Sequence, residues 1–171
     1  MGKPAILTIA DDSSVTLLQI APFIHAGHLP PILSSFLSLP SVRKIGRGIK
    51  SDLKRLSNEV KPSKAFSGAH DLATMAEERG LVPSKVVSLA DLSARILHQR
   101  LDKDPSLRLS TVWEDSVLPQ QNINYAALDA WASWLIYKKL ESIPLPGRLD
   151  FNAPAGTEVR SEERRVGKEC Q

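Results

Sequence analysis

The sequence contains a single cysteine, Cys170, next to the last of its 171 residues. One cysteine cannot form an intramolecular disulfide, and a cysteine-based zinc site needs several, so both are excluded. No segment approaches the ~18 consecutive apolar residues of a membrane span. The first residues also lack the organisation of a signal peptide. These absences favour an intracellular protein that does not span a membrane, and they leave nuclear and cytoplasmic locations open.

The length and charge of the chain set modest bounds. A chain of 171 residues is most simply one domain with a buried core. The formal charge of +3 is compatible with a polyanionic partner but does not require one. We expect one domain over residues 1–147 and a linker or tail over 148–159. Residues 160–171 resemble the translation of a sequencing-library adapter; otherwise they are a solvated tail, and we exclude them from the fold.

The hydrophobic pattern predicts an α/β order. Two apolar runs, 5–10 and 15–20, flank the turn-forming residues 11–14 and predict a β-hairpin. Residues 101–118 are expected to be irregular. The other predicted elements are a short strand at 42–46 and helices that begin near Pro31, Gly48, Asp71, Ser88 and Pro119, the last of them long.

Tyr125 and Asp129 are four residues apart in the predicted long helix, so they share one face and are separated by one turn. Most of their neighbours are apolar, and burying a carboxylate among them is costly unless its charge is compensated. A metal ion is one compensator, and a phenol one turn away could orient or deprotonate the water that the metal activates. The alternative is an amphipathic helix on which Asp129 faces solvent and Tyr125 packs.

A second candidate site lies at the junction between the short strand and the next helix. Gly46 and Gly48 allow a close backbone approach to a ligand or a positive φ. Asp52 falls in the first helical turn, where its charge also simply complements the helix dipole. The junction is not a P-loop, because no Gly-Lys-Ser/Thr follows.

Basic residues are concentrated around Asp52. They form either a solvated helix face or a set of phosphate contacts near a metal site. As substrate-binding candidates we select Lys44, Arg47 and Lys50, which are followed in the sequence by Lys54 and Arg55.

In chain order, Gly46-x-Gly48 with Asp52, Asp71-Leu72-Ala73, Leu89-x-Asp91-Leu92 and Tyr125-Ala-Ala-Leu-Asp129 resemble the DEDD superfamily of 3′-5′ exonucleases. The tyrosine is typical of the DEDDy branch, which includes RNase D and the Werner-helicase exonuclease domain. A histidine in that role would indicate the sister branch. The resemblance covers about residues 3–140, and it implies an RNase H-like fold, in which helices flank a mixed sheet.

The resemblance also implies a chemistry. Members of the family hydrolyse the terminal phosphodiester with two divalent ions about 4 Å apart. Mg²⁺ or Mn²⁺ would be held by carboxylates, because these ions prefer oxygen ligands. By resemblance, Asp52 and Asp129 are metal ligands, and Tyr125 orients the nucleophilic water. The implied partner is a single-stranded 3′ end of DNA or RNA.

The sequence departs from the family in its first motif. The family carries Asp-x-Glu on its opening strand, and no equivalent precedes Lys3 here. Asp52 and Asp129 alone supply too few ligands for two metal ions, so we expect this chain to be inactive or nearly so. The missing strand would be the central one, between the strand at 5–10 and the strand at 43–46. We therefore expect that the sequence is a fragment and that its sheet and core are incomplete.

Three functional classes remain. The first, which we favour, is a truncated Mg²⁺-dependent 3′-5′ exonuclease domain. The second is a non-catalytic RNase H-like module that binds nucleic acid or a protein partner. The third is a remnant without an independent function. In-frame sequence upstream of Met1 would distinguish them, because only the first class requires a strand that carries Asp-x-Glu.

Overall fold

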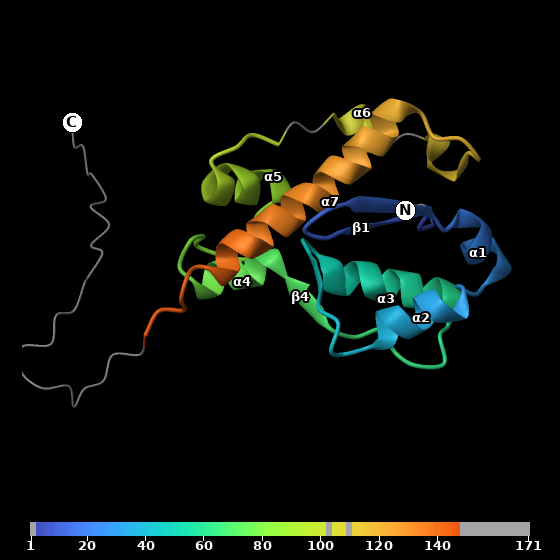
Figure 1. Ribbon diagram of the computed structural model, residues 1–171, viewed down its shortest axis with the longest axis horizontal. Coiled ribbons are helices and arrows are strands. Elements are labelled where there is room, and N and C mark those ends of the chain that lie inside the picture. The colour runs from blue at the N-terminus through green and yellow to red at the C-terminus, as the bar shows by residue number, and fades with distance from the viewer. Residues whose placement is uncertain (1–2, 102–103, 109–110, 148–171) are drawn as a thin grey trace, which may run out of the picture.

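A computed structural model describes residues 3–101, 104–108 and 111–147 of the chain (Figure 1). The segments 148–159 and 160–171, which we assigned to a linker and an adapter-like tail, lie outside the described residues. In chain order the elements are β1 (Ile6–Ala10), β2 (Val15–Gln19), α1 (Ala21–Ala26), α2 (Pro31–Ser38), β3 (Lys44–Gly46), α3 (Ile49–Val60), β4 (Ala69–Asp71), α4 (Leu72–Glu78), α5 (Leu89–Leu92), the π-helical segment η1 (Ser93–Leu97), α6 (Pro105–Arg108), the 3₁₀ segment η2 (Thr111–Glu114) and α7 (Gln120–Glu141).

The N-terminal hairpin forms as predicted. Strands β1 and β2 pair antiparallel, with Leu7 opposite Leu18. The turn is closed by Asp11, whose Oδ1 accepts hydrogen bonds from the backbone N–H groups of Ser13 and Ser14, both at 2.8 Å. These bonds favour the charged form and lower the pKa of Asp11. An Asp side chain that bonds to the backbone two or three residues ahead is the local signal that made this hairpin predictable.

A second sheet pairs β3 with β4 in parallel, with Ile45 opposite His70. Strand β4 was not predicted, because its three residues, Ala-His-Asp, contain no apolar alternation. In the described part of the chain, the hairpin and this pair are two separate two-stranded sheets. Lys44 starts the pairing by donating its backbone N–H to the carbonyl of Gly68 at 2.7 Å.

Gly68 is the backbone position where a side chain would be least tolerated. Its φ is +74°, and an added Cβ would meet the carbonyl oxygens of Val42, Pro40 and Leu39. We expect Gly68→Ala to lower the free energy of unfolding by about 3 kcal/mol, the sum of a left-handed backbone cost and steric overlap. Gly27→Ala is the matched control, because Gly27 has φ +77° but open space around it. It should lose only about 1 kcal/mol. Urea unfolding would measure both, and equal losses would contradict the steric argument.

Helix α7 begins after Pro119, as predicted, and crosses both sheets (Figure 1). It contacts β1, β2 and β3.

Two hydrophobic clusters form the core. The first cluster lies between α7 and the segments α4, α5 and η1, and its fully buried residues include Leu72, Leu92, Ile136 and Leu140. The second lies between the end of the hairpin and the helices α1, α2 and α3, and it includes Ile20, Leu37, Leu53 and Leu56.

Several helix ends follow local rules. Gly80 follows the end of α4 with φ +69°, as its C′ position predicts. Ser88 and Asp91 form the expected capping box at the start of α5.

Other segments differ from expectation. The region 101–118, expected to be irregular, contains the short helices α6 and η2, and α1 was not predicted because its six residues are too few for a helical period.

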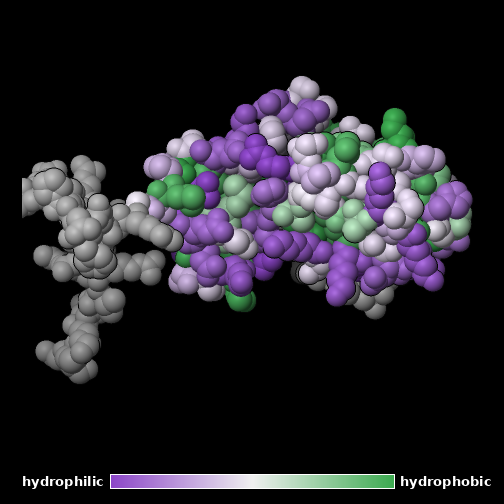
Figure 2. Space-filling model, turned by 90° about the horizontal axis from the view of Figure 1, so that it is seen from below, coloured by the Kyte–Doolittle hydropathy of each residue, from purple (hydrophilic) through white to green (hydrophobic). Residues whose placement is uncertain are grey.

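Long apolar helices are absent from the described part of the chain. None of the described helices combines the length and apolar character needed to cross a membrane. Viewed from below, the molecule shows mainly hydrophilic side chains, with hydrophobic ones in separate patches (Figure 2). The most exposed large apolar side chains, Ile32, Val86 and Val117, belong to three different segments of the chain.

Candidate active site

Asp129 lies on the core-facing stripe of α7. The buried residues Asn122, Ala126, Ile136 and Leu140 follow one another at intervals that keep them on one helix face, and position 129 belongs to the same series. Asp129 is half-buried. The alternative in which this carboxylate belongs to a solvated helix face is therefore disfavoured by its position.

Tyr125 lies one turn earlier and is also half-buried. Its ring packs against Trp113 of η2, with a centroid distance of 6.4 Å and an interplanar angle of 53°. Trp113 is itself held by a 3.1 Å hydrogen bond from Nε1 to the carbonyl of Leu107. A short helical segment that was expected to be irregular thus supports the tyrosine of the candidate site.

Asp52 lies in the first turn of α3, as predicted. The helix starts after Gly48, which has φ +79° and accepts the first helical hydrogen bonds from Ser51 and Asp52. Asp52 is an exposed residue, but nearby protein displaces part of the solvent around its carboxyl group and raises its pKa; Arg55 opposes this shift and the negative charge of Asp71 adds to it. A carboxylate in this setting is stabilised by any additional cation.

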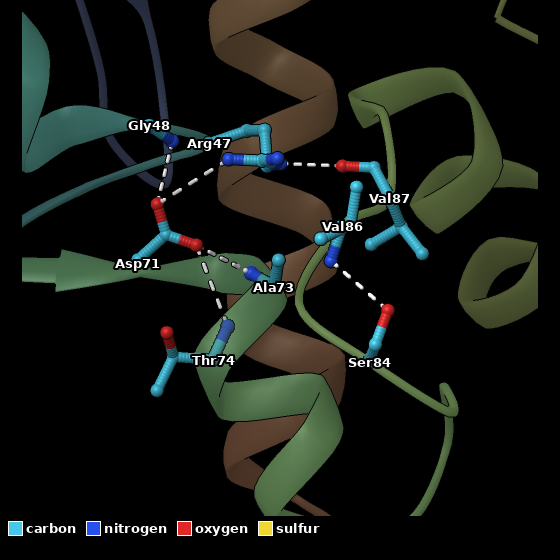
Figure 3. Close-up of polar contacts among 8 residues, drawn as sticks. All are labelled: Arg47, Gly48, Asp71, Ala73, Thr74, Ser84, Val86 and Val87. Atoms are coloured by element: carbon cyan, nitrogen blue, oxygen red, sulfur yellow. Dashed lines mark hydrogen bonds and ion pairs between the residues drawn. The ribbon is translucent and has the colours of Figure 1, made fainter.

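Asp71 connects the junction between β3 and α3 to the start of α4 through hydrogen bonds (Figure 3). Its Oδ2 accepts a 2.6 Å hydrogen bond from the backbone N–H of Gly48, and its Oδ1 caps α4 by accepting from Ala73 and Thr74. Arg47 lies 3.8 Å from the same Oδ2, and its Nε donates to the carbonyl of Val87. Only 14% of the Asp71 side chain is exposed.

The sequence places Asp71 within the family pattern but does not identify it as a residue of the site. A local signal was present, because an Asp just before Leu-Ala-Thr is typical of a helix N-cap. The hydrogen bond that Asp71 accepts from the Gly48 N–H could not be inferred from that pattern. It depends on the parallel pairing that sets Asp71 opposite Gly46.

The three basic residues selected as substrate contacts differ in where their charges lie. Lys44 is 7% exposed, and its Nζ donates a 2.6 Å hydrogen bond to the carbonyl of Leu39. Its burial lowers its pKa. Arg47 is engaged by Asp71 and Val87, as described above. Lys50 is exposed on α3. In this conformation, Lys50 is the member of the set that presents its charge to solvent.

The buried amide of Asn122 has an unusual environment. The residue is 1% exposed, and its Nδ2 has no hydrogen-bond partner within the described structure. A buried donor without an acceptor costs about 1–3 kcal/mol. Asn122 lies on the same helix stripe as Asp129, so this unsatisfied donor belongs to the face of α7 that carries the candidate carboxylate.

The described residues do not by themselves form a site for a metal ion. Within 3–101, 104–108 and 111–147, no group of three or more His, Cys, Asp or Glu side chains is arranged to hold one. Asp52 and Asp129 are carried by α3 and α7, and both helices contact β3. The two helices that carry these carboxylates therefore share β3 as a neighbour, but among the described residues the ligand set is incomplete.

Comparison with known proteins identifies the class of this fold. NrnC of Brucella melitensis superimposes with a TM-score of 0.66 at 20% identity, covering 82% of this chain and 65% of NrnC. The fold is RNase H-like, a mixed α/β structure, as expected.

A family model described as 3′-5′ exonuclease matches residues 9–143. The chain therefore belongs to the 3′-5′ exonuclease family, which confirms the resemblance inferred from its motifs. A 3′-5′ exonuclease of Arabidopsis thaliana is 31% identical over 143 residues, which are 84% of this chain and 47% of that protein. The bifunctional 3′-5′ exonuclease/ATP-dependent helicase WRN of Mus musculus is 32% identical over 114 residues, which are 67% of this chain and 8% of WRN. The chain thus spans at most about half the length of these curated relatives.

Proposed function

We propose that this chain is the larger part of a 3′-5′ exonuclease domain that hydrolyses nucleic acid phosphodiester bonds from a single-stranded 3′ end. The observation that carries the proposal is the half-buried Asp129 on the core-facing stripe of α7, one turn from Tyr125 and inside the segment matched by the family model. A carboxylate in that position needs a compensating charge or donor. Asp52 and Asp129 are the metal-binding carboxylates of the proposal, and Tyr125 orients the water.

The proposal includes Mg²⁺ or Mn²⁺ as the cofactor, in a two-ion site. Two such ions would activate the water and stabilise the leaving oxygen. The described residues supply too few ligands for that arrangement. We therefore propose that the 171-residue chain is inactive alone, and that hydrolysis requires an added segment with Asp-x-Glu.

The added segment would be an extended strand between β1 and β3. Three observations support this placement. The two sheets are separate, α7 contacts β1 and β3, and Asn122 carries a buried donor without an acceptor among the described residues. A strand in this position would pair with both sheet edges and could bring a backbone carbonyl towards α7.

The test compares the chain as given with a chain extended at its N-terminus by a β-strand that carries Asp-x-Glu. The substrates are 5′-labelled single-stranded DNA and RNA oligonucleotides. We expect the extended chain to shorten them stepwise with Mg²⁺ or Mn²⁺, whereas EDTA should abolish the reaction and the unextended chain should show none. An oligonucleotide with a blocked 3′ end is the polarity control. No hydrolysis by a well-folded extended chain would contradict the proposal, and so would cleavage of the blocked substrate.

A second candidate function is a non-catalytic module that binds nucleic acid or a protein. The incomplete ligand set among the described residues favours it. This candidate predicts metal-independent binding without hydrolysis, even in the extended chain. The same comparison therefore separates the two functions.

A further inference from the structure

The two flanks of α3 differ in charge. Leu53, Leu56 and Val60 are buried and face the core. At 100° per residue, Lys50 and Lys54 project from one side of this buried stripe, whereas Asp52 and Glu59 project from the other together with Arg55, which is a charged neighbour of Asp52. The flank that carries Asp52 belongs to the candidate active site. On the basic flank, Lys50 is already a candidate substrate contact, whereas Lys54 has no role in the site described so far.

The basic flank opens onto a groove. A cavity of about 330 Å³ lies between α3 and the segment that leads into β4. Among the described residues no acidic side chain lines it, and both lysines are exposed, whereas Phe66 is half-buried and packs on the second hydrophobic cluster. Its full lining is Lys50, Leu53, Lys54, Ser57, Ala65, Phe66 and Ala69.

This combination matches the physical requirements of a single nucleic acid strand. Sites for single strands combine cations that follow the phosphates with an aromatic ring on which a base stacks. The two lysines, four residues apart on α3, are neighbours on the helix surface, so two cations lie along one edge of the groove. The volume is at the lower end of the ~300–1,000 Å³ range of small-ligand sites, and this size suits a single nucleotide.

We propose that this groove is a second nucleic-acid contact, in which Lys50 and Lys54 bind backbone phosphates and the ring of Phe66 supports a base. The inference rests on the proposed function, because it takes the substrate class from it. It adds a site on the flank of α3 opposite Asp52, so the strand would contact the domain outside the point of cleavage.

The test measures binding without hydrolysis. The 171-residue chain is titrated into a fluorescein-labelled oligothymidine of about 12 nucleotides, in EDTA and at several KCl concentrations. We expect Lys50→Ala/Lys54→Ala to weaken binding about tenfold or more. The slope of log K against log salt should become shallower by about 0.7 for each lost phosphate contact. Lys85→Ala/Lys139→Ala is the matched control, since it removes the same charge from two exposed lysines outside the groove.

A second variant tests the aromatic contact. Phe66→Leu keeps an apolar side chain against the cluster but removes the ring. It should weaken binding about fivefold or more on oligothymidine and leave binding unchanged on an abasic strand of the same length. Equal effects of the two lysine pairs would overturn the inference, as would equally tight binding of anionic lipid vesicles or a polyglutamate peptide. Because EDTA prevents metal-dependent cleavage, loss of the proposed hydrolysis would not alter these results.

Discussion

Asp71→Ala is expected to lower the free energy of unfolding by about 3 kcal/mol. The substitution removes an N-cap, worth about 1 kcal/mol, and a charged hydrogen bond to the Gly48 N–H, worth about 1.5–3 kcal/mol. Arg47 also loses its acidic neighbour. Because the Asp71 side chain is largely buried, solvent replaces these partners poorly.

Two further variants sharpen this prediction. Asp71→Asn should lose about 2 kcal/mol, because the amide oxygen can keep the N-cap, whereas the amide nitrogen cannot accept the hydrogen bond from the Gly48 N–H. Asp12→Ala is the control for a generic aspartate loss, since Asp12 is 75% exposed and forms a surface ion pair with Lys138. It should change stability by less than about 1 kcal/mol. Urea denaturation followed by circular dichroism measures all three. A loss below 1 kcal/mol for Asp71→Ala would show that the Gly48 junction does not depend on this carboxylate.

The predictable parts of this fold are those in which a local signal is sufficient. The hairpin turn at Asp11, the capping box at Ser88, the glycine that follows α4 and the start of α7 at Pro119 all follow from residues within one turn of the feature. The prediction of an RNase H-like fold rested on the order of motifs along the chain.

The features that were missed depend on contacts between distant residues. Strand β4 exists because Ala69 and His70 pair with β3, about 25 residues earlier in the chain. The burial of Lys44 follows from the path of the chain past Leu39, and its sequence context gave no sign of it. The role of Asp71 at Gly48 arises from that same pairing. For the site, sequence could therefore propose which residues participate, but it could not show which charges are already engaged.

The face of α7 determines how the candidate site should respond to substitution. Asp129 shares its stripe with the buried residues Asn122 and Ile136 and is itself half-buried. Ser133 Oγ donates a 2.8 Å hydrogen bond to the backbone carbonyl of Asp129, a contact that does not involve the carboxylate. Replacing the carboxylate by an amide of equal size should therefore preserve the helix while removing the negative charge.

In the chain extended by Asp-x-Glu, Asp129→Asn is expected to reduce Mg²⁺-dependent hydrolysis at least about 1,000-fold. Loss of a metal-binding carboxylate removes several kcal/mol of transition-state stabilisation, and each 1.36 kcal/mol corresponds to a factor of ten in rate. Tyr125→Phe should lower kcat about 100-fold with little change in KM, because the ring that packs on Trp113 is retained and only the hydroxyl is lost.

Asp12→Asn, an exposed aspartate in the hairpin turn, is the matched control and should retain full activity. Thermal unfolding of each variant separates loss of catalysis from loss of folding. If folded Asp129→Asn keeps activity within tenfold of the parent, Asp129 does not hold a metal. A Tyr125→Phe variant that raises KM at unchanged kcat would instead make Tyr125 a substrate contact. The kinetic constants separate these roles. A metal ligand and a water-orienting phenol affect the rate of the chemical step, whereas a substrate-binding residue affects the occupancy of the site.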